Sequence, residues 1–312
     1  MTAGGAPRLV VLRALGLGDF LTGVPALRAL ADALPAHERL LLAPAFLSPL
    51  AALLGDVVHE VVDTEGRGAP PAALPAAAIG ADVAVNLHGR GPQSHAALRA
   101  AEPRRLIAFA CPAAGVSGPE WRAGEHEVAR WCRLLSESGI PADPAALDLA
   151  PPGGTERHGA TVLHPGAAAP ARRWPVDRWA AVARAERTAG RDVLVSAGPG
   201  EEEAARSVAA AAALPPGAVR AGGDLEDLAR LVAGAGRVAC ADTGVAHLAT
   251  AFGVPSVVLF GPTPPAEWGP PPDRDRHRVL WTGRRGDPNG PAPDPGLLEI
   301  EPAAVSAELA AL

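Results

Sequence analysis

The chain has 312 residues, a hydrophobic content of 48% and a formal net charge of −6 at neutral pH. This length is enough for two domains of roughly 150 residues each, and the negative charge argues against a general nucleic-acid binder. All 28 basic residues are arginine and tyrosine is absent, a bias typical of a G+C-rich genome.

The three cysteines, Cys111, Cys132 and Cys240, are widely spaced and form no CxxC pattern, which predicts neither a disulfide framework nor a zinc site. We expect buried thiols in a reducing compartment. No apolar run approaches the roughly 18 residues of a membrane span, and the first apolar run resembles a strand rather than a signal peptide. These features predict a cytoplasmic protein, and peripheral contact with the inner membrane surface stays open.

The N-terminal half begins with an apolar strand over 8–14 and a helix from about residue 20 to residue 34. Gly16, Gly18 and Asp19 lie between them, where the glycines allow a tight turn and the carboxylate stands at the helix start. Taken alone, this pattern favours a plain helix cap for Asp19. The G-x-G-x-x-G fingerprint is incomplete, so a dinucleotide site is only weakly indicated.

A second polar segment follows a strand predicted over 81–87 and carries His88, Arg90 and His95. It lies at the carboxyl end of its strand and could line the same cleft as Asp19. Its side chains would then meet an anionic or polyhydroxylated acceptor, whereas a solvated loop is an equal alternative. Further strands are predicted over 40–43, 57–62 and 104–109, and helices over 49–54 and 125–139.

A proline- and glycine-rich segment, 141–154, predicts a domain boundary near Pro152, with domains over 1–152 and 153–312. The second half alternates apolar strands with helices. The strands are expected over 160–163, 191–196, 237–241 and 256–260. Strands joined through helices form right-handed parallel crossovers, so the turns after them meet at one sheet edge, where open α/β sheets bind ligands.

The turns at that edge are rich in Gly, Pro, Arg and acidic residues, as expected of a nucleoside-diphosphate pocket. Asp242 would accept hydrogen bonds from sugar hydroxyls, Glu201 would take a ribose, and Arg172 or Arg173 would neutralise the diphosphate. The helix beginning near Val245 offers free N–H groups to a phosphate. The candidate donor residues at the strand ends are His164, Gly166, Glu201, Asp242, Thr243, Gly244, Gly261 and Thr263.

Two plainer alternatives concern the same residues. A structural βαβ unit with a capping aspartate would explain the Asp242 turn, and a solvated charge patch would explain the arginine pair. The Asp-Thr-Gly of aspartic proteases is excluded, because that chemistry needs two such carboxylates on β-rich lobes and this chain has one between a strand and a helix.

Four segments together resemble glycosyltransferase family 9, the family of ADP-heptose:lipopolysaccharide heptosyltransferases. They are GLGDFLTGVPALRAL, HPGAAAPARRWPVDRWAAVA, AGPGEEE and CADTGVAHLATAFGVPSVVLFGPT, in that order along the chain. The resemblance implies an α/β GT-B fold, in which two Rossmann-like domains with parallel sheets face each other across a cleft. The N-terminal domain would bind the acceptor and the C-terminal domain the nucleotide-sugar donor.

The resemblance also implies residue roles. Asp19 matches the proposed catalytic base, with Gly18, His88, Arg90 and His95 as acceptor-side candidates. Arg172 falls where the family usually has a phosphate-binding lysine, which keeps the charge but changes the geometry. Glu201 matches an acid that holds the ribose. Asp242, Thr243, Gly244 and His247 match residues that hold the donor sugar and diphosphate. The Ser or Thr often found after the HPG-like turn is Ala here.

The predicted function is an inverting transfer of a heptose or related sugar, without metal or cofactor, to a hydroxyl of a cell-surface glycan or glycolipid. An ADP-sugar is the favoured donor. The alternatives are a GT-B sugar-nucleotide epimerase, which would turn over the donor without an acceptor, and a catalytically silent nucleotide-sugar-binding protein.

Overall fold

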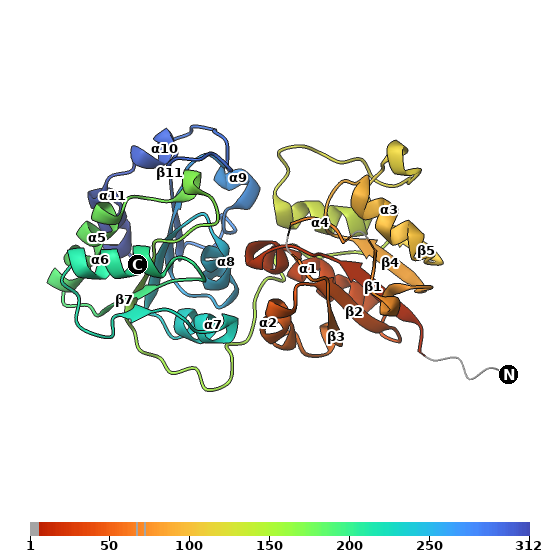
Figure 1. Ribbon diagram of the computed structural model, residues 1–312, viewed down its shortest axis with the longest axis horizontal. Coiled ribbons are helices and arrows are strands. Elements are labelled where there is room, and N and C mark those ends of the chain that lie inside the picture. The colour runs from red at the N-terminus through yellow and green to blue at the C-terminus, as the bar shows by residue number, and fades with distance from the viewer. Residues whose placement is uncertain (1–5, 67, 72) are drawn as a thin grey trace. The chain divides into compact units, whose positions relative to one another are not determined.

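The computed structural model describes residues 6–66, 68–71 and 73–312. The chain forms two compact units, Met1–Leu147 and Asp148–Leu312, each with its own parallel sheet and flanking helices (Figure 1). The break between the units falls inside the proline- and glycine-rich segment 141–154. The binding roles assigned from the sequence to each domain stay predictions.

The first unit contains a five-stranded parallel sheet in the order β3-β2-β1-β4-β5. Its strands are β1 (Arg8–Leu12), β2 (Glu38–Ala43), β3 (Glu60–Asp63), β4 (Val83–Asn86) and β5 (Arg105–Ile107). Its helices are α1 (Leu17–Ala33), α2 (Ser48–Ala52), α3 (Gln93–Ala100) and α4 (Glu127–Glu137), of which α1 and α4 pack against each other. Leu12 of β1 lies opposite Leu42 of β2 and Asn86 of β4, so the carboxyl ends of these strands are adjacent.

The second unit contains a six-stranded parallel sheet in the order β11-β10-β9-β6-β7-β8. Its strands are β6 (Thr161–His164), β7 (Val193–Ser196), β8 (Val219–Arg220), β9 (Arg237–Ala241), β10 (Ser256–Phe260) and β11 (His277–Trp281). Its helices are α5 (Val176–Thr188), α6 (Glu202–Ala211), α7 (Leu225–Ala233), α8 (Gly244–Ala251), α9 (Pro265–Trp268), α10 (Pro295–Leu298) and α11 (Pro302–Ala310).

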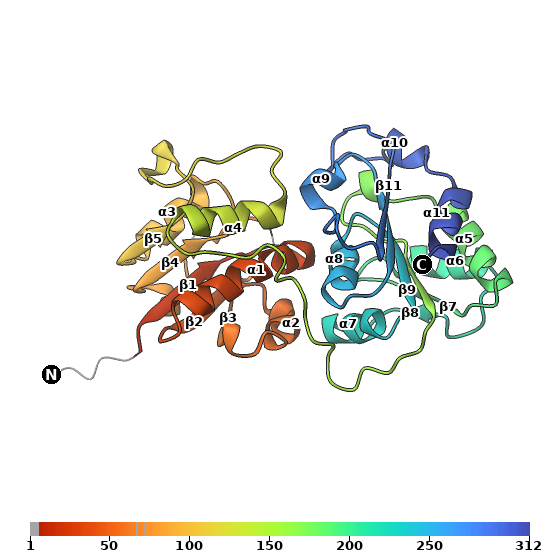
Figure 2. The same cartoon turned by 180° about the vertical axis from the view of Figure 1, so that it is seen from behind.

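Helices cover both faces of this second sheet. Helices α5, α6 and α11 lie on one face and α7 and α8 on the other (Figures 1 and 2). A buried cluster lies under the first group, where Trp179 and Val182 of α5 pack with Val195 and Leu259 of the sheet. Central strands such as β10 are buried along their whole length, as expected of a parallel sheet with two covered faces.

The local structure differs from the sequence-based prediction at α1 and at β11. Helix α1 begins at Leu17, not near residue 20, because Gly16 serves as its N-cap and the second glycine lies inside the first turn. Strand β11 was not predicted. It pairs in parallel with β10, with Ser256 opposite His277, and it forms the edge of the sheet.

Candidate active site

Four polar turns of the second unit lie at one edge of its sheet. Strands β10, β9, β6 and β7 are neighbours in that order and run parallel, so their carboxyl ends are adjacent. The residues at or just after these ends include most of those predicted to hold the donor. They are His164, Gly166, Glu201, Asp242, Thr243, Gly244, Gly261 and Thr263. This is the edge at which open α/β sheets bind ligands.

Glu201 stands immediately before α6, and groups from two strand ends hold its carboxylate. The Gly198 N–H donates to Glu201 Oε2 at 2.9 Å, and His164 Nε2 lies 3.3 Å from the same oxygen. His164 Nδ1 lies 3.0 Å from Ser196 Oγ, and burial lowers the pKa of the imidazole. A Cβ at Gly166 would lie 2.0 Å from Glu201 Oε2, so glycine leaves the room that this carboxylate occupies.

Asp242 follows β9 directly and is 6% exposed. Arg172 Nη1 donates to the Asp242 carbonyl oxygen at 3.2 Å and lies 3.8 Å from Asp242 Oδ2. Burial raises the pKa of Asp242 to about 6, although Arg172 and a hydrogen bond with the Thr263 side chain act in the opposite direction. Above that pH the carboxylate is charged and poorly solvated, a state in which hydrogen bonds from ligand hydroxyls are favourable.

Helix α8 starts at the same strand end. Thr243 is its N-cap, and the Thr243 hydroxyl accepts a hydrogen bond from the Val245 N–H at 3.1 Å. The positive end of the helix dipole suits an anionic group. His247, on the same helix, packs edge-on against Trp268 with ring centroids 6.0 Å apart.

Two further candidate donor residues contribute differently. Arg173 is exposed and its Nε donates to the Ala167 carbonyl oxygen at 2.9 Å, so Arg172 is the arginine that contacts Asp242. Gly261 follows β10, where a Cβ would lie 3.0 Å from the Cβ of Leu297. The glycine therefore allows the turn to pack closely on α10.

In the first unit, Asp19 lies in the first turn of α1, three residues after the N-cap. Its Oδ2 accepts a hydrogen bond from the Gly16 N–H at 3.2 Å, and Gly18 lies in the same turn. Burial raises the pKa of the Asp19 carboxyl; the positive charge of Arg13 lowers it and the negative charge of Glu127 raises it further. The carboxylate is therefore a stronger base than that of an exposed aspartate.

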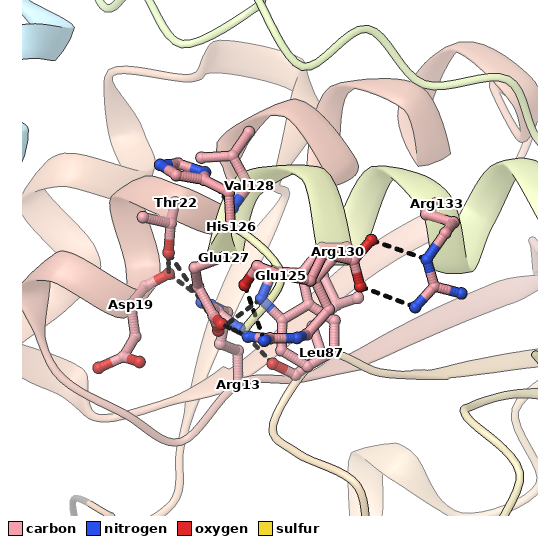
Figure 3. A network of polar contacts seen from close by, with 11 residues as sticks. Arg13, Asp19, Thr22, Leu87, Glu125, His126, Glu127, Val128, Arg130 and Arg133 are labelled. Carbon is pink, nitrogen blue, oxygen red and sulfur yellow. Dashed lines mark hydrogen bonds and ion pairs between the residues drawn. The ribbon is translucent and has the colours of Figure 1, made fainter. Parts of the chain in front are cut away.

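Arg13, which the sequence did not indicate as a functional residue, lies beside Asp19 (Figure 3). Its side chain is 1% exposed and donates hydrogen bonds to the carbonyl oxygens of Asp19 and Leu87. It also forms an ion pair with Glu127 of α4 at 3.4 Å. The available sequence signal was an arginine directly after an apolar strand, whereas no local pattern indicates a partner 114 residues away.

The segment after β4 lies at the same sheet edge as the Asp19 turn, because β4 pairs with β1. The His88 N–H donates to Asn86 Oδ1 at 3.0 Å. Burial and, to a smaller extent, the charge of Arg13 lower the pKa of His88 to about 4, so the ring is neutral near pH 7. Arg90 is exposed on this loop.

His95 is fully buried. Its Nε2 lies 2.8 Å from the Phe109 carbonyl oxygen and its Nδ1 lies 3.1 Å from Asn86 Nδ2. With both ring nitrogens bonded inside the unit, His95 orders the loop rather than presenting a group to a ligand. We therefore leave it out of the acceptor-side proposal.

Among residues 6–66, 68–71 and 73–312, no group of three or more His, Cys, Asp or Glu side chains is placed to hold a metal ion. The Asp273-Arg274-Asp275 segment has the Asp-x-Asp pattern of metal-dependent transferases, but its Arg274 forms an ion pair with Asp148 of the same unit at 2.6 Å. All three cysteines are buried and free, and burial raises the pKa of Cys132 to about 12.

No helix in the described part of the chain is both long and apolar enough for a membrane span.

Comparison with known proteins gives a consistent picture. The sequence model of glycosyltransferase family 9 (heptosyltransferase) matches residues 121–289. The structure is similar to ADP-heptose lps heptosyltransferase II from E. coli, with a TM-score of 0.76 and 20% identity over 97% of this chain and 98% of that one. It is also similar to a family 9 glycosyl transferase from Veillonella parvula, with a TM-score of 0.78 and 20% identity over 98% and 96% of the two chains.

A third similar structure is more distant. The iron-containing dodecameric glycosyltransferase TibC from E. coli has a TM-score of 0.58 and 14% identity, over 100% of this chain and 77% of its own. No curated protein sequence matches the chain significantly. The structural likenesses show the fold, two parallel α/β sheets of the GT-B class, and the match to the family model confirms the resemblance found in the sequence.

Proposed function

Because the chain belongs to glycosyltransferase family 9, we propose that it transfers a heptose or a related sugar from a nucleotide-diphosphate sugar to an acceptor hydroxyl. The proposed donor is an ADP-sugar, and the acceptor is a hydroxyl of a cell-surface glycan or glycolipid. The anomeric centre inverts and no metal ion takes part. The observation that carries the proposal is the partly buried Asp19 carboxyl, which the Gly16 N–H holds in the first turn of α1 and whose pKa is raised.

Asp19 is the proposed general base. A base works best when its pKa lies close to the working pH, and burial moves Asp19 in that direction from the ordinary value near 3.9. The Gly16 N–H and the first turn of α1 fix where its carboxylate lies. Gly18, His88 and Arg90 are the proposed acceptor-side residues, because they lie on the loops after β1 and β4.

The proposed donor site lies at the strand ends of the second unit. Arg172 and the first amides of α8 would neutralise the diphosphate, with Arg173 as a second cation. Glu201 would accept hydrogen bonds from the ribose, and Asp242 would accept them from the sugar. The remaining proposed donor residues shape this edge or cap its turns. They are His164, Gly166, Thr243, Gly244, His247, Gly261 and Thr263.

In the proposed reaction the acceptor oxygen attacks the anomeric carbon while its proton passes to the Asp19 carboxylate. The bond between the anomeric carbon and the phosphate oxygen breaks, and its electron pair leaves with the nucleoside diphosphate. Arg172 and the α8 amides stabilise the growing negative charge, which is the stage at which fixed donors accelerate a reaction most. A glycolipid acceptor would place the enzyme at the cytoplasmic face of the membrane in peripheral contact.

Asp19→Asn tests the proposal. Asparagine can still accept the Gly16 N–H, so the fold should survive while proton transfer is lost. We expect turnover to fall by about 10²–10⁴-fold, the usual contribution of a positioned base, with ADP affinity unchanged. Transfer would be measured with ADP-heptose and a truncated lipopolysaccharide core, and ADP affinity by calorimetry on the same preparation.

Asp32→Asn is the matched control, because Asp32 is exposed on the same helix. It should keep full turnover. Loss of a general base should leave about a hundredth of the turnover or less. If Asp19→Asn retains more than roughly a tenth of wild-type turnover, Asp19 is only a cap. Conversion of the donor without any acceptor would point to an epimerase instead, and ADP binding with neither reaction would point to a silent binding protein.

A further inference from the structure

We propose that Arg13 is a positioning residue that fixes the Asp19 turn and the loop after β4 in one arrangement. This inference rests on the proposed role of Asp19 as the base. It adds a fully buried residue that connects the first turn of α1, the end of β4 and helix α4.

The hydrogen bonds of Arg13 join the first turn of α1 to the end of β4 (Figure 3). Nε donates to the Asp19 carbonyl oxygen and Nη1 to that of Leu87, the residue before His88. Nη2 donates to Thr22 Oγ1 at 2.9 Å, and the Thr22 hydroxyl donates to the Asp19 carbonyl oxygen at 2.9 Å. The first turn of α1 is thus held twice from the end of β1, and the same side chain holds the end of β4.

Helix α4 supplies the counter-ion. Glu127 Oε1 lies 3.4 Å from Arg13 Nη2, and it also accepts from Trp131 Nε1 at 2.8 Å. Arg130 donates to the other oxygen of the carboxylate. The Arg13 guanidinium lies over the Trp131 ring, 5.0 Å from its centroid, a distance at which a cation and an aromatic ring attract each other.

Space for this side chain is built into α1. A Cβ at Gly23 would lie 2.9 Å from Arg13 Nε and 3.0 Å from its Cδ, so a larger residue would displace the guanidinium. Burying a charge is costly unless it is paired and hydrogen-bonded. Arginine suits the site because its planar fork presents several donors in fixed directions, whereas lysine offers a single flexible point charge.

Arg39 is an internal comparison. It is also buried, at 8% exposure, but it lies at the opposite end of the same sheet, where it pairs in register with Leu9 near the start of β1. Its donors go to the carbonyl oxygens of nearby loops, including those of His37 and Asp56. Arg39 therefore stabilises only the loops next to it. Arg13 instead connects Asp19, the residue proposed to act in catalysis, with a second loop and a counter-ion.

The charges around Asp19 make the inference measurable. Besides burial, Arg13 lowers the pKa of the Asp19 carboxyl and Glu127 raises it. His88, on the loop after β4, has a pKa lowered to about 4 and is uncharged near pH 7. Removal of the two charges one at a time should therefore shift the Asp19 pKa in opposite directions. Opposed shifts would show that both charges act on the Asp19 carboxyl, and the turnover of a variant that keeps the charge but loses the guanidinium then tests positioning.

The experiment uses the full-length protein with ¹³C-labelled aspartate, and Asp19→Asn assigns the carboxyl signal. Arg13→Gln should raise the Asp19 pKa and Glu127→Gln should lower it. Arg13→Lys should keep the Asp19 pKa close to that of wild type. It should nevertheless lose turnover by about 100-fold, the effect of a catalytic group displaced by an ångström. ADP affinity should not change in any of these variants.

Arg39→Lys is the matched control for loss of a buried guanidinium and should leave both the Asp19 pKa and turnover unchanged. If Arg13→Gln does not fold, Arg13→Lys and Glu127→Gln still decide the question. Shifts of the Asp19 pKa in the same direction in Arg13→Gln and Glu127→Gln, or full turnover in Arg13→Lys, would overturn the role of Arg13 and leave the proposed function intact. Full turnover in Asp19→Asn would instead overturn the proposed function, while the carboxyl titration would still report on Arg13.

Discussion

Among single residues, Asp242 is a proposed donor contact whose burial lowers the stability of the folded state when the carboxyl is charged. Its pKa is raised from the ordinary value of 3.8 to about 6, mainly because the carboxyl is buried. The folded state thus binds the proton more tightly than the unfolded state. The stabilising contribution of this group is complete below pH 4 and is lost as the pH rises through 6.

We therefore expect Asp242→Asn to stabilise the second unit above pH 6 in the absence of donor. The raised pKa corresponds to a gain of up to about 3 kcal/mol at pH 7.5, which should shrink towards zero near pH 4. Urea unfolding at several pH values would measure it. Asp273→Asn, which changes an exposed aspartate, is the control. A variant less stable than wild type at every pH would contradict this assignment of the charge.

Between elements, the contact of Gly166 after β6 with Glu201 before α6 is the sharpest steric constraint in the donor region. Gly166→Ala would place a Cβ 2.0 Å from Glu201 Oε2 and force the carboxylate away. We expect ADP binding to weaken by about 1.5–3 kcal/mol, the range for a hydrogen bond to a charged group. Calorimetry would measure it, with Gly153→Ala as control because a Cβ there meets nothing within 4 Å. Unchanged affinity would remove Glu201 from the proposed donor contacts.

The sequence pattern was most accurate for strands that are continuous apolar runs. The strands over 237–241 and 256–260 have the predicted bounds, because both are buried apolar runs between clear turn signals. Strand β11 escaped prediction because prolines and charges precede it and because its pairing partner decides its conformation. The start of α1 was misplaced because the two glycines predicted a turn, whereas the second glycine lies within the helix.

The candidate site likewise contains residues that the sequence could group and contacts that it could not. Parallel strands bring their carboxyl ends together, so residues after them, such as Glu201 and Asp242, could be grouped from the sequence. Contacts made across the unit could not. The link between Arg13 and Glu127 depends on how α4 packs on α1, and the burial of His95 depends on the carbonyl of Phe109.

At the scale of the whole molecule, the proposed reaction requires that the negative charge of the leaving diphosphate be neutralised. Metal-dependent transferases use a bound cation for this task. Here the proposed cationic groups are Arg172, which contacts Asp242, together with Arg173 and the amides of α8. Chelation tests this assignment directly.

We expect transfer from ADP-heptose to continue at the wild-type rate in EDTA, because the charge of an arginine and of helix amides is not removed by chelation. Product would be detected directly by mass spectrometry, so that no metal-dependent coupling enzyme is needed. As a matched observation, Arg172→Ala should lose turnover in EDTA and in magnesium alike, because a free cation would not replace a guanidinium fixed beside Asp242. Loss of wild-type turnover on chelation, restored by magnesium, manganese or iron, would show that a metal neutralises the diphosphate and would leave Arg172 a lesser role.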